Sequence, residues 1–143
     1  MKKKKGELNL SFGMIFSIIL IIIFIIFAFY GIKTFLNLKD DVQSKKFITD
    51  LQNDVNKLWA GSQGSREVEY LLSNKVTEIC FINDEFQNLV LNSEESFERG
   101  NIANIDIIKT LNEESSLCIP NLKGKVTFTI EKNFGEKLVT IKK

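Results

Sequence analysis

The sequence predicts an α+β protein, in which one long N-terminal transmembrane and amphipathic helix is followed by a small antiparallel β-sheet head. Two observations support this class. The stretch from Leu8 to Ile32 contains no charged residue and consists mostly of Ile, Leu and Phe. After the glycine-containing segment from Ala60 to Ser65, the pattern changes to short runs in which apolar and polar residues alternate, as expected for strands with one buried face.

The apolar stretch has the length of a membrane span. A hydrocarbon core about 30 Å thick requires about 20 apolar residues in a helix, and the segment from Phe12 to Ile32 meets that requirement. A cleaved secretory signal is the main alternative, but it ordinarily has a shorter apolar region that ends in small residues. Ala28-Phe29-Tyr30 does not have this pattern. We therefore expect a transmembrane helix in the lipid bilayer, with Tyr30 near the outer interface.

The charges before the span predict its orientation. Lys2 to Lys5 are consecutive lysines, and the positive-inside rule keeps such clusters in the cytoplasm. The prediction is a single-pass protein of the cell membrane with its N-terminus inside and its C-terminal domain outside. The chain as a whole has a net charge of +1, so nucleic acid binding is not expected.

Beyond the span, apolar residues recur every three or four positions, which predicts that the helix continues as an amphipathic segment. The head's own sheet, packing between Ile48 and Trp59, is one candidate partner for this stripe, and another subunit is the alternative. Trp59 is expected to fill the core between helix and sheet. The stripe consists of Phe35, Leu38, Val42, Ile48, Leu51, Val55 and Leu58. The expected organisation is a basic leader (1–6), a transmembrane helix (7–34), an amphipathic extension (35–60) and a head (61–143).

Alternation within the head predicts several strands, two of which form a C-terminal hairpin around Asn133-Phe134-Gly135. The segment 93–116 is ambiguous and is left open, with a short helix around 102–111 as one possibility. The expected strands are 66–72, 76–82, 87–91, 125–131 and 137–141.

The chain has two cysteines, Cys80 and Cys118, each between apolar neighbours. Two buried free thiols are one possibility. In a small domain outside the cytoplasm, however, an even pair favours a disulfide, because such domains have little core to stabilise them.

Few residues point to catalysis. The sequence contains no histidine, and it has no glycine-rich phosphate loop, no nucleophile elbow and no cluster with metal-ligand spacing. Adjacent acids occur at 84–85, 94–95 and 113–114, where polar surroundings favour solvated side chains. We therefore expect no enzyme activity, no cofactor and no metal.

The N-terminus resembles the class III signal of archaeal type IV pilin-like proteins, through Lys2 to Lys5, Gly6, Glu7 and the apolar run that begins at Leu8. The resemblance implies processing in which Lys5 and Gly6 are recognised, Gly6 is the last residue removed and Glu7 becomes the new N-terminus. It also implies self-association through the apolar helix. The positions expected to form the assembly core are Phe12, Phe16, Ile19, Ile23 and Phe27.

Two functions follow as hypotheses. One is a structural subunit of a pilus-like surface filament or secretion-type assembly. The other is a permanently anchored single-pass protein that presents a small extracytoplasmic binding or accessory domain. Loss of the leader would favour the first hypothesis, and its retention would favour the second.

Overall fold

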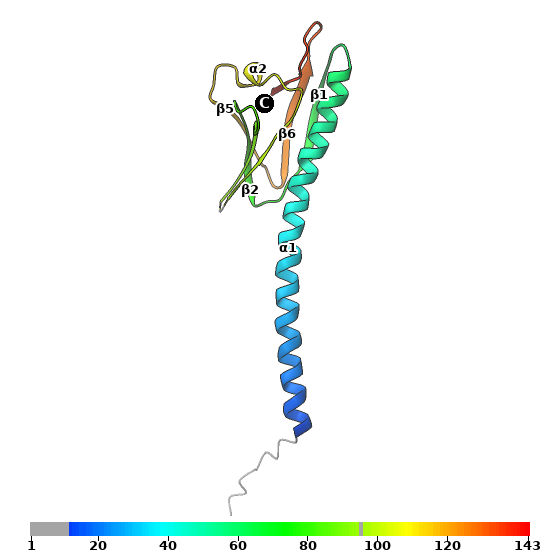
Figure 1. Ribbon diagram of the computed structural model, residues 1–143, viewed down its shortest axis with the longest axis vertical. Coiled ribbons are helices and arrows are strands. Elements are labelled where there is room, and N and C mark those ends of the chain that lie inside the picture. The colour runs from blue at the N-terminus through cyan, green and yellow to red at the C-terminus, as the bar shows by residue number, and fades with distance from the viewer. Residues whose placement is uncertain (1–11, 95) are drawn as a thin grey trace, which may run out of the picture. The chain divides into compact units, whose positions relative to one another are not determined.

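A computed structural model describes residues 12–94 and 96–143. It begins with α1 (Phe12–Ala60), a helix of 49 residues, which is followed by a small antiparallel β-sheet region (Figure 1). The α+β class predicted from the sequence is thereby confirmed. The chain divides into two compact units, one ending at Leu38 and the other running from Lys39 to Lys143.

The described part of the first unit is helical throughout, and each of its side chains is exposed. The segment forms a helix because it contains no proline and because its serine and threonine side chains bond within the helix. Ser17 and Thr34 donate from their hydroxyl groups to the carbonyl oxygens four residues earlier, Gly13 and Tyr30. Their hydroxyl groups are therefore satisfied within the helix and need no partner outside it.

The second unit holds two antiparallel sheets rather than the single sheet expected. One sheet has the order β1-β6-β7 and the other has the order β4-β3-β2-β5. A short helix, α2 (Ile107–Leu111), begins after Asp106, whose side chain accepts from the backbone nitrogen of Lys109. The strands are β1 (Gly64–Leu71), β2 (Val76–Ile82), β3 (Leu89–Ser93), β4 (Phe97–Gly100), β5 (Ser116–Pro120), β6 (Lys125–Lys132) and β7 (Thr140–Lys142).

The inner faces of the two sheets share one apolar core. On β6, Val126, Phe128 and Ile130 are buried while the residues between them are more accessible. The ring of Phe128 meets that of Phe81 on β2 at a centroid distance of 6.1 Å. The core therefore follows from the period-two alternation of the strands.

The second half of α1 packs against this core, alongside β1 (Figure 1). Phe47, Leu51 and Val55 are buried, and the ring of Phe47 lies edge-on to that of Tyr70 on β1, with centroids 5.2 Å apart. At Gly100 on β4, an added Cβ would stand 2.9 Å from the Cδ1 atom of Ile48. The absence of a side chain at Gly100 therefore allows α1 to approach the second sheet closely.

The sequence analysis predicted most of the helices and strands, but not all of their first and last residues. The strand predicted at 76–82 matches β2, and the strand at 125–131 is one residue shorter than β6. The last predicted strand, 137–141, is wrong in its limits, because β7 begins only at Thr140. The open segment 93–116 contains β4 and α2, and α2 is shorter than the helix considered at 102–111.

One expectation for α1 is wrong. Trp59 is 45% exposed, and Leu58, one residue earlier on the helix, packs against the core instead. The expectation that the head covers the stripe beyond Ile48 is confirmed, since Leu51 and Val55 are buried and Ile48 packs against the core. The buried face follows Ser44, Phe47, Leu51 and Val55, and successive residues of a helix are about 100° apart, so Trp59 is rotated away from it.

Candidate functional site

The first candidate site is the apolar half of α1, which could span a membrane by its length and composition. Between Phe12 and Leu38 no side chain is buried. A helix that is apolar all round requires either lipid or other apolar helices about it. The apolar half of α1 is therefore long enough to cross a membrane. None of the described residues covers its surface.

The five predicted assembly positions all lie on this surface. Phe12, Phe16, Ile19, Ile23 and Phe27 are exposed, and their spacing places them along one side of the helix. Other apolar residues such as Phe24 and Ile26 are exposed as well, so no one side of the helix is singled out. The assembly face stays a prediction. The processing residues Lys5, Gly6 and Glu7 lie outside the described residues, as does the start of the apolar run at Leu8.

The second candidate site is the disulfide between Cys80 on β2 and Cys118 on β5. These residues are directly opposite each other in the antiparallel register, and cross-strand neighbours have side chains on the same face of a sheet. Their neighbours Ile79 and Ile119 point into the core. The pairing favoured from the sequence is thus present, and the alternative of two free thiols is not.

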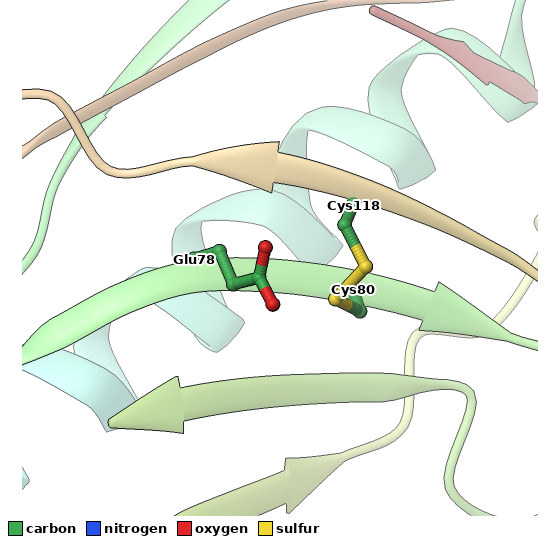
Figure 2. Close-up of side chains that lie close together, drawn as sticks. All are labelled: Glu78, Cys80 and Cys118. Atoms are coloured by element: carbon green, nitrogen blue, oxygen red, sulfur yellow. A yellow bond between two sulfur atoms is a disulfide. The ribbon is translucent and has the colours of Figure 1, made fainter. Parts of the chain in front are cut away.

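Glu78 lies on the same face as the disulfide, as Figure 2 shows. Ligand atoms of Glu78, Cys80 and Cys118 lie within 4.8 Å of one another. Metal binding by cysteine requires the thiolate, whereas both sulfur atoms are here committed to the disulfide. Glu78 instead accepts a hydrogen bond from the side-chain amide of Asn92 on β3, at 3.0 Å. In this oxidised form the arrangement is a structural cross-link.

The third feature is a polar contact that holds α1 on the head. The Tyr70 hydroxyl donates to the Asp54 carboxylate at 2.9 Å, and the Arg66 guanidinium lies 3.5 Å from the same carboxylate. Burial, and then the hydrogen bond to Asp54, raise the pKa of Tyr70 well above its usual range. Tyr70 therefore remains a hydrogen-bond donor at any physiological pH.

A buried lysine closes the end of α1. Lys132 is the last residue of β6, and its ammonium group donates to the carbonyl oxygens of Trp59 and Gly61 at 2.6 and 2.7 Å. The last carbonyl groups of a helix have no partners within the helix, and a cation is favourable there. The sequence analysis missed this role, although the alternation through Phe128 and Ile130 places Lys132 on the inner face.

Within the described ranges, none of the paired acids belongs to a group of possible metal ligands. Asp84 accepts from the backbone nitrogens of Phe86 and Gln87, both at 2.9 Å, and these bonds hold the pKa of Asp84 below its usual range. Its carboxylate shapes the β2–β3 loop. Glu113 and Glu114 are exposed after α2, and Glu95 lies outside the described residues. The expectation of no enzyme activity stays a prediction.

Comparison of this chain with protein-family models, curated proteins and solved structures gives no match.

Proposed function

We propose that this protein is a structural subunit of a pilus-like surface filament or a related secretion-type assembly. The observation that supports the proposal is the composition of α1. One helix runs from Phe12 to Ala60, and all its side chains up to Leu38 are exposed. Subunits that leave the bilayer must bury such a surface, and contact between the apolar helices of several subunits does so without any charged group.

The head fits a role outside the cytoplasm. Disulfides persist in oxidising compartments, and Cys80–Cys118 links two strands of the head. With Lys2 to Lys5 in the cytoplasm, the helix would cross the bilayer once and the head would be outside. In an assembly, the helices would form the core and the heads would face the medium.

The N-terminal residues add a processing step to the proposal. Through its resemblance to archaeal type IV pilin-like proteins, the chain would be cut after Gly6, which removes the lysines that keep the N-terminus in the cytoplasm. Glu7 would then begin the mature subunit. Removal of these charges would permit the helix to leave the bilayer, because a buried charge in the new interface would be costly.

A permanent anchor with a binding head is the second candidate, and one observation favours it. Phe86 in the β2–β3 loop and Phe134 in the β6–β7 loop are large aromatic side chains that are mostly exposed. Aromatic side chains are frequent energetic anchors at protein interfaces. A head that recruits a partner through these loops would not require filament formation.

Shearing cells and sedimenting the released material tests the filament proposal. Wild-type protein should pellet as polymers, whereas Gly6→Leu should be retained, uncleaved, in the membrane fraction. The control Leu8→Ile preserves the apolar character after the cut and should behave as wild type. Wild-type protein that is found only in the membrane fraction, with the same length as Gly6→Leu, would favour the permanent anchor instead.

A further inference from the structure

The outer face of the β4-β3-β2-β5 sheet carries three metal-ligand side chains next to one another. Glu78 and Cys80 are two residues apart on β2, and Cys118 is directly opposite Cys80 on β5. Residues two apart on a strand have side chains on the same face, as do residues opposite each other in an antiparallel pair. Their ligand atoms lie within 4.8 Å of one another (Figure 2). The register therefore gathers two sulfur atoms and one carboxylate at one point of the sheet.

The two strands that carry these side chains are also held together by the core. On the inner face of the sheet, Ile79 on β2 is opposite Ile119 on β5, and these side chains are 0% and 2% exposed. The other edge of β2 pairs with β3. We expect this packing to keep β2 and β5 paired when the disulfide is reduced. Two free thiols would then remain opposite each other, beside the Glu78 carboxylate.

A neighbouring amide orients this cluster, and solvent reaches it from one side. The side-chain amide of Asn92 on β3 donates to the Glu78 carboxylate at 3.0 Å and lies 3.6 Å from the Cys80 sulfur. Hydrogen bonds from such partners fix the orientation of side chains that bind metal ions. Cys80 is buried, whereas Cys118 and Glu78 are only half-buried. An ion from solvent therefore approaches past Cys118 and Glu78.

Two thiolates and one carboxylate are a ligand set for a divalent metal ion that accepts sulfur, above all Zn²⁺. Zinc binds such ligands tetrahedrally, at about 2.3 Å from sulfur and about 2.0 to 2.2 Å from oxygen, which places neighbouring ligand atoms about 3.5 to 3.8 Å apart. The three ligand atoms lie within 4.8 Å of one another, so small side-chain rotations bring them to these distances. A water molecule would complete the tetrahedron.

We propose that Glu78, Cys80 and Cys118 form a redox-dependent metal site, which binds a zinc-type divalent ion when the cysteines are reduced and is closed by the disulfide when they are oxidised. A thiol reductant opens the site in two exchanges. Its thiolate attacks one sulfur, which forms a mixed disulfide and releases the other cysteine. A second thiol releases the remaining cysteine and yields the reductant's own disulfide, so that two electrons and two protons pass to the protein. The metal ion then displaces the two thiol protons.

Cobalt binding to the full chain in detergent micelles tests the site, because Co²⁺ takes the place of zinc and its bonds to thiolates absorb in the near ultraviolet. The protein is reduced with a trialkylphosphine, which takes oxygen from water while the two cysteines gain hydrogen, and the phosphine is removed without air. Reduced wild-type protein should bind one Co²⁺ per chain with this absorption band and release protons as it binds. Oxidised protein and reduced Cys118→Ser should not bind at the same concentrations.

Glu78→Gln can still accept the hydrogen bond from Asn92 but removes the charged ligand, so the affinity of the reduced protein for Co²⁺ should fall by about tenfold or more. Glu67→Gln is the matched control, because Glu67 is an exposed glutamate on β1 of the other sheet, and it should bind as wild type does. Absence of the band in reduced wild-type protein would overturn the proposal, as would a band that requires two chains per ion. Equal affinities of Glu78→Gln and wild type would overturn the role of Glu78. None of these outcomes depends on filament formation, which the shearing experiment measures separately.

Discussion

Between Phe12 and Leu38 every side chain of α1 is exposed, whereas between Lys39 and Ala60 the same helix buries Ser44, Phe47, Leu51 and Val55. The first half contains the more apolar residues, yet the second half contains the buried ones. The difference shows that composition and burial are separate properties within one helix. The second half is covered by its own head, and the first half is covered by no residue that the structure describes.

The largest expected effect separates two phenylalanines of this helix. Phe47 is 1% exposed and Phe35 is 67% exposed. Phe47→Ala should lower the free energy of unfolding of the head by about 3 to 5 kcal/mol, because it removes transfer free energy and leaves a cavity. Phe35→Ala should change it by less than about 0.5 kcal/mol. Denaturant unfolding of the full chain in detergent micelles measures both. Equal effects would contradict the division of α1.

The disulfide should matter for the head alone. Replacing both cysteines, Cys80→Ala with Cys118→Ala, removes a link across a sequence separation of 38 residues. Such a link stabilises by about 4 kcal/mol in the chain-entropy model, so the same unfolding measurement should show a loss near that size. Membrane insertion of α1, followed by flotation, should be unchanged. Alkylation of both cysteines in the unreduced mature protein would show that the disulfide is absent.

A smaller loss is expected where β6 closes the end of α1. Lys132→Met keeps much of the side-chain volume but removes the bonds to the carbonyl oxygens of Trp59 and Gly61. Hydrogen bonds to charged groups contribute about 1.5 to 3 kcal/mol, and a loss in this range is expected. Lys46→Met is the control, because Lys46 forms an exposed pair with Asp50, worth about 0.3 to 0.5 kcal/mol. Equal losses for the two variants would refute the role of Lys132.

The smallest effect concerns the exposed pair of Lys109 and Glu136, at 2.7 Å. The Lys109 hydrogen bond holds the pKa of Glu136 below 4.5, and Glu136 raises the pKa of Lys109 above 10.5. The pair therefore stabilises between these ordinary values. Its contribution is lost as the pH falls through the lowered pKa of Glu136 or rises through the raised pKa of Lys109.

Glu136→Gln should lower the thermal midpoint slightly at neutral pH and leave it unchanged in strong acid, where the wild-type pair is also lost. Glu114→Gln, at an exposed position after α2, is the control and should have no such pH-dependent difference. A difference for Glu136→Gln that persists in strong acid would show that the substitution acts through packing rather than charge.

The features predicted from the sequence are those set by local pattern. The helix at Phe12–Ala60 follows from a long run without proline, and β2 and β6 follow from alternation. The Cys80–Cys118 pairing could be predicted because the chain has only two cysteines and the head is small. The helix and the two strands depend on residues that are close in sequence. The disulfide depends on a pairing for which the chain offers only one combination of cysteines.

The features that were missed depend on which face of an element meets which neighbour. Trp59 and Leu58 are adjacent, and the phase of the helix decides that Leu58 packs inward. The division of the strands into two sheets places Phe81 opposite Phe128, a long-range contact that no local pattern specifies. The role of Lys132 required both the end of α1 and the end of β6 to be placed. The membrane-length segment of α1 was predictable from composition alone.

The central claim is that the apolar half of α1 becomes a polymer core instead of remaining a permanent anchor. The intact mass of the mature protein from its native membrane, with N-terminal sequencing by mass spectrometry, tests it most directly. A mature chain that begins at Glu7 is the predicted result. A mature chain that retains Lys2 to Lys5 would contradict the claim and leave the anchored binding head as the function.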